Sequence, residues 1–475
     1  MSSTSQARGR IDALLDENSF IEIGARVKAR STDFNLAQTD TPSDGVVTGY
    51  GVIDGNLVYV YAQDASVLGG SIGEMHAKKI ARLYDLALKT GAPVIALIDS
   101  AGLRLQEATD ALNALGEIYL KQVNASGVIP QITAVFGGCG GGLSVLSALS
   151  DFTFMEEKNG KLFLNSPNAL DGNYAEKCDT AAAAFQSAEA GTVDVVGDEA
   201  AVYAGIRELV SLLPSNNEAD DAVEECTDDL NRSCEGIDGA AADPAVFFTM
   251  ISDGSGFFET KKSYAKDMVT GFIRLNGVTV GAVGNRTSLF DDAGKEAEHF
   301  DAVLSARGAE KAADFVKFCD AFGLPVVSLT NVKGFKACMC NEKRLPRALA
   351  ELTEAFGSAT VPKINIVADK AYGTAAVIMN SQALGADITV AWPDAEIGTM
   401  DAKTAARILC ADDAAKQAEC AADYAAKQTS ATGAAERGYV DEIVEPADTR
   451  KYVIGALEML YTKRDERPAK KHGAI

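Results

Sequence analysis

Histidine is scarce in this chain, and long apolar runs are missing. Its 475 residues include three histidines, His76, His299 and His472, which leaves few candidates for a Ser-His-Asp or Cys-His mechanism. No apolar stretch approaches the roughly 20 residues that a helix needs to cross a bilayer, and residues 1–8 lack the apolar core of a signal peptide. We therefore expect a cytoplasmic protein with little scope for catalysis by imidazole.

Basic residues are also in deficit. The chain has 44 Lys and Arg against 67 Asp and Glu, which gives a formal net charge of −23. A surface this acidic repels the phosphate backbone, so we expect no nucleic-acid partner. Small anionic ligands are not excluded, because backbone N–H groups can bind them locally whatever the global charge.

The cysteines do not suggest a disulfide framework. Nine are scattered through a large chain, a pattern that favours reduced thiols. Cys338 and Cys340 form a C-x-C pair, and Cys319 is a possible neighbour. No second pair and no histidine stands at a spacing typical of metal ligands. We therefore expect no metal site.

An internal repeat divides the chain. Residues 91–102 and 323–334 each read as a helix end, a turn, a buried strand and a glycine loop. Two further landmarks recur at the same spacing along the chain, 129–135 with 361–367 and Gly141 with Gly373. We call this constant spacing, the distance in sequence from Gly141 to Gly373, the repeat offset. Its constancy over several landmarks predicts two copies of one fold.

Each copy alternates buried strands with helical patterns, which indicates α/β architecture. Apolar residues recur at helical spacing in residues 78–88 and 309–322. Residues 218–243 hold ten acidic residues and one basic residue, and we interpret this segment as a solvated linker. The predicted domains are residues 1–235 and 236–475.

A glycine-rich loop, residues 137–142, is the first candidate for a functional site. It follows a strand-like run and precedes a helix-like run, and five of its six residues are glycine. Without Cβ atoms, successive N–H groups can turn toward a ligand at the start of a helix, where they can hold an oxyanion. A purely structural strand-to-helix turn would need only one or two glycines.

Two further loops are candidates. Residues 370–375 occupy the place in the second copy that matches the first glycine loop. In residues 63–73, Gly69 and Gly70 can approach a ligand closely, and Lys78 and Lys79 after them can meet phosphates. The alternative for the last loop is a helix cap followed by solvated lysines.

The motifs together resemble those of the biotin-dependent acyl-CoA carboxyltransferases, a family that includes the beta subunit of propionyl-CoA carboxylase and the alpha subunit of methylmalonyl-CoA decarboxylase. The resemblance runs almost end to end. It is carried by the segments Arg10–Glu22, Gln63–Ile80, Asp99–Glu107, Ser126–Gln131, Asp151–Met155 and Ala391–Gly398.

The resemblance implies two tandem crotonase-like domains, the first binding acyl-CoA and the second binding biotin. The implied reaction moves a carboxyl group between N1′-carboxybiotin and the α-carbon of a short acyl-CoA of the propionyl or acetyl type. Biotin would arrive on a separate carrier protein, because the chain has no biotinyl-lysine motif. The implied partners are this carrier, a biotin carboxylase or a membrane decarboxylase subunit, and further copies of the chain in a homo-oligomer, usually a hexamer built from dimers.

The resemblance also assigns roles to residues. The implied oxyanion holes are Gly141 with Gly142 and Thr374 with Ala375. The implied CoA- and biotin-binding positions are Gly69, Gly70, Lys79, Gly102 and Gly373, and the implied substrate pocket contains Tyr372 and Val377. Two oxyanions develop in the reaction, on the ureido and thioester oxygens, so two sets of donors are needed.

The chain departs from the family's pattern in its second half. Thr374 stands where the family usually has glycine, and Val377 replaces a common acidic residue near the acyl pocket. Three alternatives stay open. The direction of transfer is open, so the chain can instead be the alpha subunit of a sodium-pumping acyl-CoA decarboxylase. A biotin-independent crotonase-type enzyme would share the first oxyanion hole and use Glu107 as its acid or base, and the altered second loop motivates an inactive scaffold.

Overall fold

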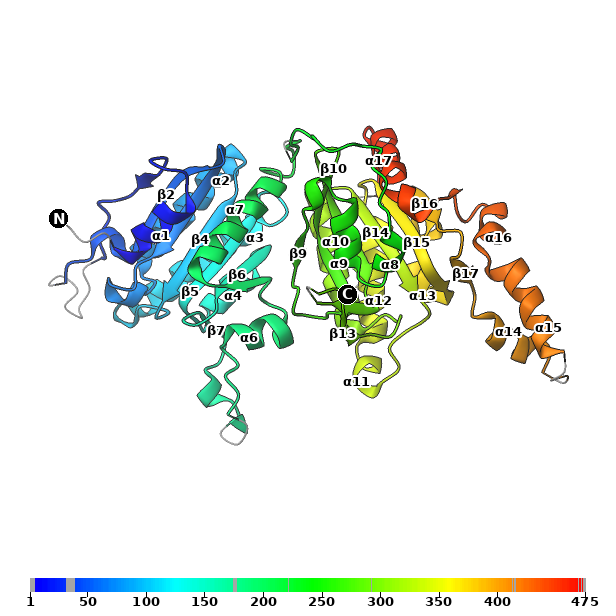
Figure 1. Cartoon of the computed structure of the whole chain (residues 1–475). Coiled ribbons are helices and arrows are strands. Elements are labelled where there is room, and N and C mark those ends of the chain that lie inside the picture. Colours follow the sequence, from blue (N-terminus) through cyan, green and yellow to red (C-terminus); the bar gives the residue numbers. More distant parts are fainter. Residues whose placement is uncertain are drawn as a thin grey trace. The chain divides into compact units, whose positions relative to one another are not determined.

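The computed structural model describes residues 5–30, 39–173, 177–220, 222–291, 293–411, 413, 416–468, 470 and 472. The chain forms two compact units, Met1–Ala222 and Val223–Ile475 (Figure 1). Each unit is built on one eight-stranded sheet, and a separate two-stranded hairpin belongs to the second. This is the mixed α/β architecture expected from the alternating patterns. No helix of the described residues is long and apolar enough to cross a membrane.

The sheet of the first unit mixes antiparallel and parallel pairing. Its strands follow the order β1-β2-β3-β4-β5-β6-β8, and β7 pairs with β5. Pairing is antiparallel from β1 to β3 and parallel from β3 onward. The strands are β1 (Ile21–Ile23), β2 (Val46–Ile53), β3 (Asn56–Gln63), β4 (Val94–Ser100), β5 (Gln131–Gly140), β6 (Phe152–Glu156), β7 (Lys161–Phe163) and β8 (Val195–Gly197).

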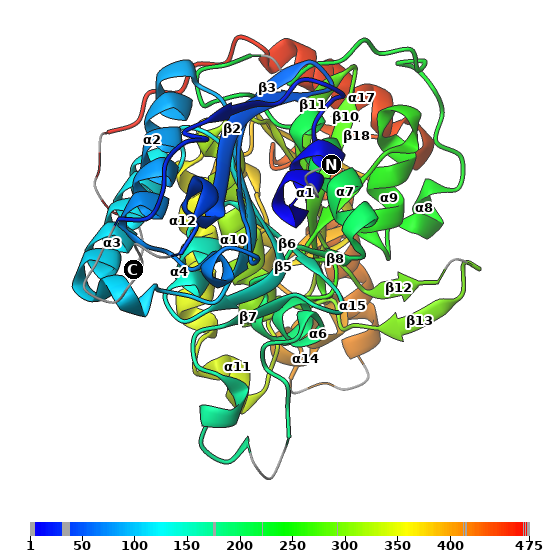
Figure 2. The ribbon, with the colours of Figure 1, turned by 90° about the vertical axis from the view of Figure 1, so that its left-hand side faces the viewer.

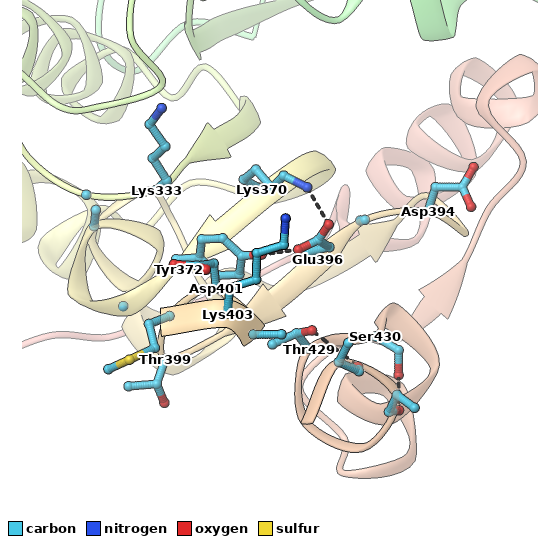
Figure 3. A pocket seen from close by; sticks show the side chains of 18 of the residues that line it. Lys333, Lys370, Tyr372, Asp394, Glu396, Thr399, Asp401, Lys403, Thr429 and Ser430 are labelled. Carbon is cyan, nitrogen blue, oxygen red and sulfur yellow. Dashed lines mark hydrogen bonds and ion pairs between the residues drawn. The ribbon is translucent and has the colours of Figure 1, made fainter. Parts of the chain in front are cut away.

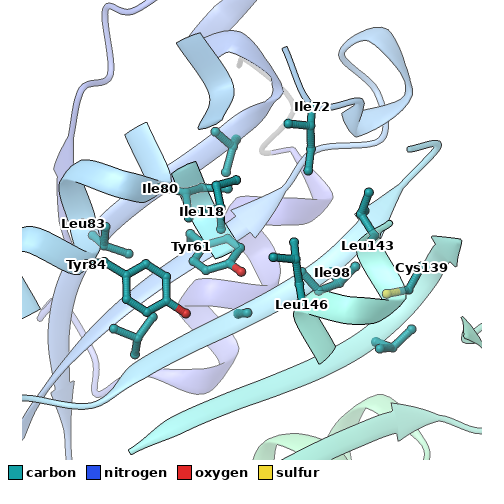
Figure 4. Close-up of a cluster of buried hydrophobic side chains, with 14 of the residues drawn as sticks. Tyr61, Ile72, Ile80, Leu83, Tyr84, Ile98, Ile118, Cys139, Leu143 and Leu146 are labelled. Atoms are coloured by element: carbon teal, nitrogen blue, oxygen red, sulfur yellow. The ribbon is translucent and has the colours of Figure 1, made fainter. Parts of the chain in front are cut away.

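Helices cover both faces of this sheet (Figure 2). On one face lie α2 (Glu74–Thr90), α3 (Ala108–Ala125) and α4 (Leu143–Ala148), and on the other lie α1 (Gln6–Leu14) and α7 (Glu199–Leu212). A short helix, α6 (Ala183–Phe185), precedes β8. The core under α2, α3 and α4 is apolar and fully buried (Figure 4). Its side chains include Ile72, Ile80, Leu83, Ile98, Ile118, Leu143 and Leu146.

The second unit repeats the topology. Its sheet follows the order β9-β10-β11-β14-β15-β16-β18, and β17 pairs with β15 as β7 does with β5. The strands are β9 (Phe258–Thr260), β10 (Met268–Leu275), β11 (Val278–Asn285), β14 (Val326–Val332), β15 (Lys363–Tyr372), β16 (Ile388–Ala391), β17 (Glu396–Gly398) and β18 (Glu442–Ile443), and the hairpin is β12 (Ser288–Phe290) with β13 (Glu296–His299). The helices are α8 (Ile237–Ala240), α9 (Pro244–Ile251), α10 (Ala306–Ala321), α11 (Met339–Glu342), α12 (Leu345–Ser358), α13 (Gly373–Ile378), α14 (Ala402–Leu409), α15 (Gln417–Tyr424), α16 (Ala431–Glu436) and α17 (Thr449–Leu460).

The repeat extends to strand register. Val94 of β4 pairs with Gln131 of β5, and Val326 of β14 pairs with Lys363 of β15, so both partners keep the repeat offset. The N–H groups of Gln131 and Lys363 each donate to a carboxylate 2.8 Å away, that of Asp151 and Asp387 respectively. The duplication predicted from spacing is therefore confirmed by equivalent strand pairing and equivalent hydrogen bonds in the two units.

The acidic segment between the repeats is not a solvated linker throughout. Val223 forms a bridge with Val278, and the N–H of Glu224 donates to Gly277 O at 2.9 Å. Further on, Cys234 is buried, and its N–H donates to Ala447 O at 2.8 Å. The segment from Val223 onward belongs to the second unit, so the boundary between the units precedes the expected one at residue 235.

A buried lysine recurs in both copies. Lys79 in α2 donates to Ser43 O at 2.9 Å and to Val46 O. Lys311, its counterpart in α10 by the repeat offset, donates to the carbonyls of Lys261, Tyr264 and Met268 at 2.8–3.0 Å. Burial lowers the pKa of Lys79 to about 8 and that of Lys311 to about 7. Each lysine ties its helix to the chain that leads into an antiparallel strand.

We predict that Lys311→Met lowers the free energy of unfolding by about 3 kcal/mol, because three buried carbonyls lose their donor. Lys317→Met, on the exposed side of the same helix, is the matched control and is expected to change little. Urea unfolding followed by circular dichroism measures both. Equal midpoints for the two variants would contradict the structural role of Lys311.

Candidate active site

The glycine loop of the first unit ends in a sharp turn from β5 into α4. Gly141 has a φ of +61°, in the left-handed region that favours glycine. Its own N–H donates to Phe163 O at 2.9 Å and is therefore not free to bind a ligand. The next two N–H groups, of Gly142 and Leu143, begin α4 and donate to no acceptor within the described part of the chain. The free donor pair is thus one residue later than predicted.

The second unit has the same turn between β15 and α13. Gly373 has a φ of +62°, and the N–H groups that follow are those of Thr374 and Ala375. Neither donates to an acceptor in the described residues. By the repeat offset, Thr374 corresponds to Gly142 and Ala375 to Leu143. The two units therefore present equivalent donor pairs.

Tyr119 of α3 packs against the first turn. Its hydroxyl donates to Gly142 O at 2.6 Å. A Cβ at position 142 would lie 2.9 Å from that hydroxyl oxygen and 3.1 Å from Leu115 Cδ2. The turn therefore has little room for a side chain, which explains glycine at position 142 on packing grounds.

The loops after β3 and β4 run side by side at the same edge of the sheet. The N–H of Ala101 donates to Gly69 O at 2.8 Å, and a Cβ on Gly70 would lie 2.4 Å from Asp99 O. Gly102 has a φ of +102° and enough space around it for a side chain. Parallel strands place this edge, at their carboxyl ends, where ligands bind in α/β folds. The structure thus brings Gly69, Gly70 and Gly102 to the edge that carries the first donor pair.

Lys79 does not reach this edge as a free cation. Its side chain is 7% exposed and its ammonium group is occupied by backbone carbonyls. The prediction that Lys79 meets CoA phosphates is contradicted by this burial. Lys78 is exposed, and its ammonium group lies 2.6 Å from a carboxylate oxygen of Glu74.

Glu107 is part of a buried charge network. Arg104 contacts both Glu107 and Asp44, at 2.8 and 2.6 Å, and the three side chains are fully buried. The second oxygen of Glu107 accepts the N–H of Glu74, the first residue of α2, at 2.6 Å. Both carboxylate oxygens are thus engaged in fixing the fold, which argues against Glu107 as a catalytic acid or base.

His76 belongs to the same network and is not available for proton transfer. Its backbone N–H donates to Asp44 Oδ2 at 2.7 Å, and its Nδ1 lies 2.9 Å from Asp44 O. Burial, followed by the positive charge of Arg104, lowers the pKa of His76 to about 3. The ring is therefore neutral and structural.

A cavity of about 1090 Å³ opens beside the second donor pair (Figure 3). Tyr372 and Lys370 line it from β15, and both contact the carboxylate of Glu396 on β17. Burial, followed by the hydrogen bond to Glu396, raises the pKa of Tyr372, so its hydroxyl stays protonated. α14, α15 and the segment after α15 complete the wall.

A second cavity of about 870 Å³ lies against the same turn. Gly373 and Thr374 line both cavities, whereas Val377, 42% exposed, lines the second one. Polar side chains form part of its wall, and these include Thr330, Asn365 and Thr389. Thr389 is 3% exposed, and its hydroxyl has no hydrogen-bond partner among the described residues.

Two features of this region were not predicted from the sequence. Leu143 was not recognised as a donor, although the repeat offset pairs it with Ala375. The contacts of Tyr372 and Lys370 with Glu396 depend on the pairing of β15 with β17, which no local pattern signals. In the described residues, no cluster of three His, Cys, Asp or Glu could hold a metal ion.

Comparisons with known proteins show the family to which the chain belongs. The carboxyl transferase domain model matches residues 3–475. The methylmalonyl-CoA decarboxylase subunit alpha of Propionigenium modestum is 38% identical, over 99% of this chain and 92% of the relative. The propionyl-CoA carboxylase beta chain of Roseobacter denitrificans is 38% identical, over 99% and 93%.

A solved structure also resembles this chain in fold and in sequence. Transcarboxylase 12S, described as a hexamer with hydrolysed methylmalonyl-CoA bound, has a TM-score of 0.90 and 38% identity, with 98% of this chain and 92% of that chain covered. The family match spans nearly the whole chain, and both relatives match it nearly end to end. The chain belongs to the carboxyl transferase family.

Proposed function

We propose that the chain transfers a carboxyl group between N1′-carboxybiotin and the α-carbon of a short acyl-CoA. The observation that carries this proposal is the pair of equivalent turns, each with two adjacent N–H groups that donate to no acceptor in the described residues. Family membership adds the reaction class. A chain with one such turn would suffice for ordinary thioester chemistry, whereas a carboxyl transfer creates negative charge on two different oxygens.

The first turn is assigned to the acyl-CoA. Gly142 and Leu143 N–H groups would receive the thioester oxygen as negative charge develops on it. Gly69, Gly70 and Gly102 lie at the same sheet edge and let the backbone approach the CoA chain closely. One oxyanion donor is worth about 3 kcal/mol in measured systems, so the pair contributes much of the stabilisation that α-proton removal requires.

The second turn is assigned to biotin. Thr374 and Ala375 N–H groups would receive the ureido oxygen, and the cavity of about 1090 Å³ beside them has room for a bicyclic ring. Biotin supplies the carboxyl group and, once it has lost that group, the base that takes the α-proton. The chain's own residues then need only to orient the two reactants and stabilise charge.

The ionisable side chains near the two turns are protonated or already engaged in other contacts, which supports a reaction without a side-chain base. Tyr372 stays protonated, and Glu396 is bound to both Tyr372 and Lys370. In the first unit, Glu107 and His76 are locked into the buried network. The same residues serve carboxylation and decarboxylation, because the transition state is shared by the two directions.

The proposed reaction also needs a protein that carries biotin and a protein that loads or unloads it. We propose that a separate carrier protein brings biotin, loaded by a biotin carboxylase or unloaded by a membrane decarboxylase subunit. We also propose a homo-oligomer, a hexamer as in transcarboxylase 12S, in which the first unit of one copy works with the second unit of another. Val377 would contact the acyl group and favour an apolar substituent such as the methyl of methylmalonyl-CoA.

The purified chain is predicted to form carboxybiotin from methylmalonyl-CoA and free biotin at millimolar biotin. Release of propionyl-CoA should depend on biotin and match the carboxybiotin formed, which mass spectrometry measures directly. Decarboxylation of methylmalonyl-CoA at the same rate without biotin would instead favour a crotonase-type enzyme. Binding of CoA esters with no turnover under either condition would favour a scaffold.

Gly142→Ala is predicted to lower kcat about 100-fold, because its Cβ would displace the donor turn against Tyr119 and Leu115. Gly116→Ala in α3, where a Cβ meets nothing within 4 Å, is the control. Adding Tyr119→Phe should recover part of the loss by removing the hydroxyl oxygen. At the second turn, Thr374→Val should keep kcat within a few-fold, since the donors are backbone groups. Unchanged kcat in Gly142→Ala would contradict the assignment.

Glu107→Gln separates the proposal from the crotonase-type alternative. We expect a lower midpoint in urea unfolding and a kcat within about threefold of the parent chain at low temperature, because the side chain stabilises the fold. A general acid or base would lose 100-fold or more. The exposed Glu117→Gln on α3 is the control for charge. A loss of that size with an unchanged unfolding midpoint would overturn the structural role.

A further inference from the structure

The C-x-C pair is a chemically distinct feature that carboxyl transfer does not use. Cys338 precedes the short helix α11 and Cys340 lies within it. Their sulfur atoms are 2.8 Å apart, and Cys340 is exposed. Asn341 Nδ2 donates to the sulfur of Cys338 at 3.1 Å. The two thiols are therefore mutually accessible and open to solvent.

This pair differs from the other cysteines in its electrostatic setting. Burial raises the pKa of the Cys139 thiol to about 12 and that of the Cys319 thiol well above its usual value. By contrast, hydrogen bonds from Cys340 and then Asn341 lower the pKa of Cys338 to about 7. The lowered pKa favours the thiolate of Cys338, which is the form that reacts with disulfides.

The surroundings fit two-sulfur chemistry better than metal binding. Within the described residues no third His, Cys, Asp or Glu joins the pair, whereas zinc in structural sites takes four ligands. Cys319 is buried in α10 and does not complete a cluster. A dithiol without further ligands is suited to closing into a disulfide.

We propose that Cys338 and Cys340 form a redox modification site that reacts with small-molecule disulfides. The Cys338 thiolate attacks one sulfur of the small disulfide, breaks its S–S bond and releases one thiolate. Cys340, after losing its proton, attacks the Cys338 sulfur and releases the second. One small disulfide is reduced to two thiols while the protein dithiol is oxidised to one disulfide. The 2.8 Å approach of the sulfurs makes the second step intramolecular and fast.

The site is connected to the cavity beside the second turn. Gly334 and Phe335, a few residues before Cys338, line that cavity. The loop is fastened by Leu304, whose N–H donates to Gly334 O at 3.0 Å, and by Asn341, whose Oδ1 accepts the Ala306 N–H at 2.8 Å. Oxidation removes the thiolate to which Asn341 donates, and Asn341 is one of the residues that fasten this loop.

The test is oxidation of the full-length chain by glutathione disulfide at pH 7, followed by alkylation and peptide mass spectrometry. We expect a peptide carrying both Cys338 and Cys340 to lose two hydrogens, and dithiothreitol to restore it. Cys340→Ser should stop at the mixed glutathione adduct on Cys338. A chain that binds glutathione at neither sulfur, or forms no internal disulfide at equilibrium, would overturn the proposal.

Alkylation kinetics give a second, independent measurement on the reduced chain. At pH 7 the lowered pKa of Cys338, offset by lower nucleophilicity, predicts iodoacetamide labelling about fivefold faster than that of a cysteine in a short unstructured peptide. The rate should level off just above pH 7 rather than near 8.5. Labelling at the rate of the peptide cysteine, with a rise continuing to pH 9, would contradict the reactive thiol. Neither readout requires carboxyl transfer, so their outcome is separate from that of the proposed function.

Discussion

The structure depends on one backbone constraint that occurs twice. Gly141 and Gly373 adopt left-handed conformations, with φ of +61° and +62°, at the ends of β5 and β15. This conformation turns the chain abruptly from a buried strand into a helix, so that the next two N–H groups have no partner in the helix. These N–H groups donate to no acceptor in the part of the chain that the structure describes, and both turns are therefore suited to receiving an oxygen that becomes negatively charged. The sheet holds the turns in place through the pairing of β5 with β7 and of β15 with β17.

The two copies diverge behind these equivalent turns. In the first unit, the apolar side chains of Ile98 and Leu146 fill the space between α4 and the sheet (Figure 4). In the second unit the residue equivalent to Ile98 is Thr330, which donates to Asn365 Oδ1 at 2.8 Å and contributes to the wall of a cavity. A rigid apolar support suits a turn that needs only to hold an oxyanion. The polar, more open surroundings of the second turn leave room for a ring and for an acyl substituent, in agreement with its proposed role.

Much of the fold could be predicted from the sequence, because its main evidence is a repeat with constant spacing. The repeat offset located β4, β5 and their counterparts, and the glycine loops located the turns. The errors came from contacts that local patterns do not encode. Gly141 was predicted as a donor, but the return of β7 supplies Phe163 O to its N–H. Lys79 was expected to be a surface cation, but its ammonium group donates to the carbonyl of Ser43, which lies 36 residues earlier in the chain. The acidic segment looked solvated, but Val223 and Cys234 pack on the second unit.

In the proposed function the backbone turns stabilise the developing charge, and no side chain of the reaction site acts as the base. Exchange of the α-protons of propionyl-CoA with D₂O, followed by NMR in the presence of the purified chain and no biotin, tests this most directly. We expect exchange no faster than in buffer alone, although propionyl-CoA is bound, because the base arrives only with biotin. Exchange at a rate comparable to turnover would reveal a side-chain base and contradict the account.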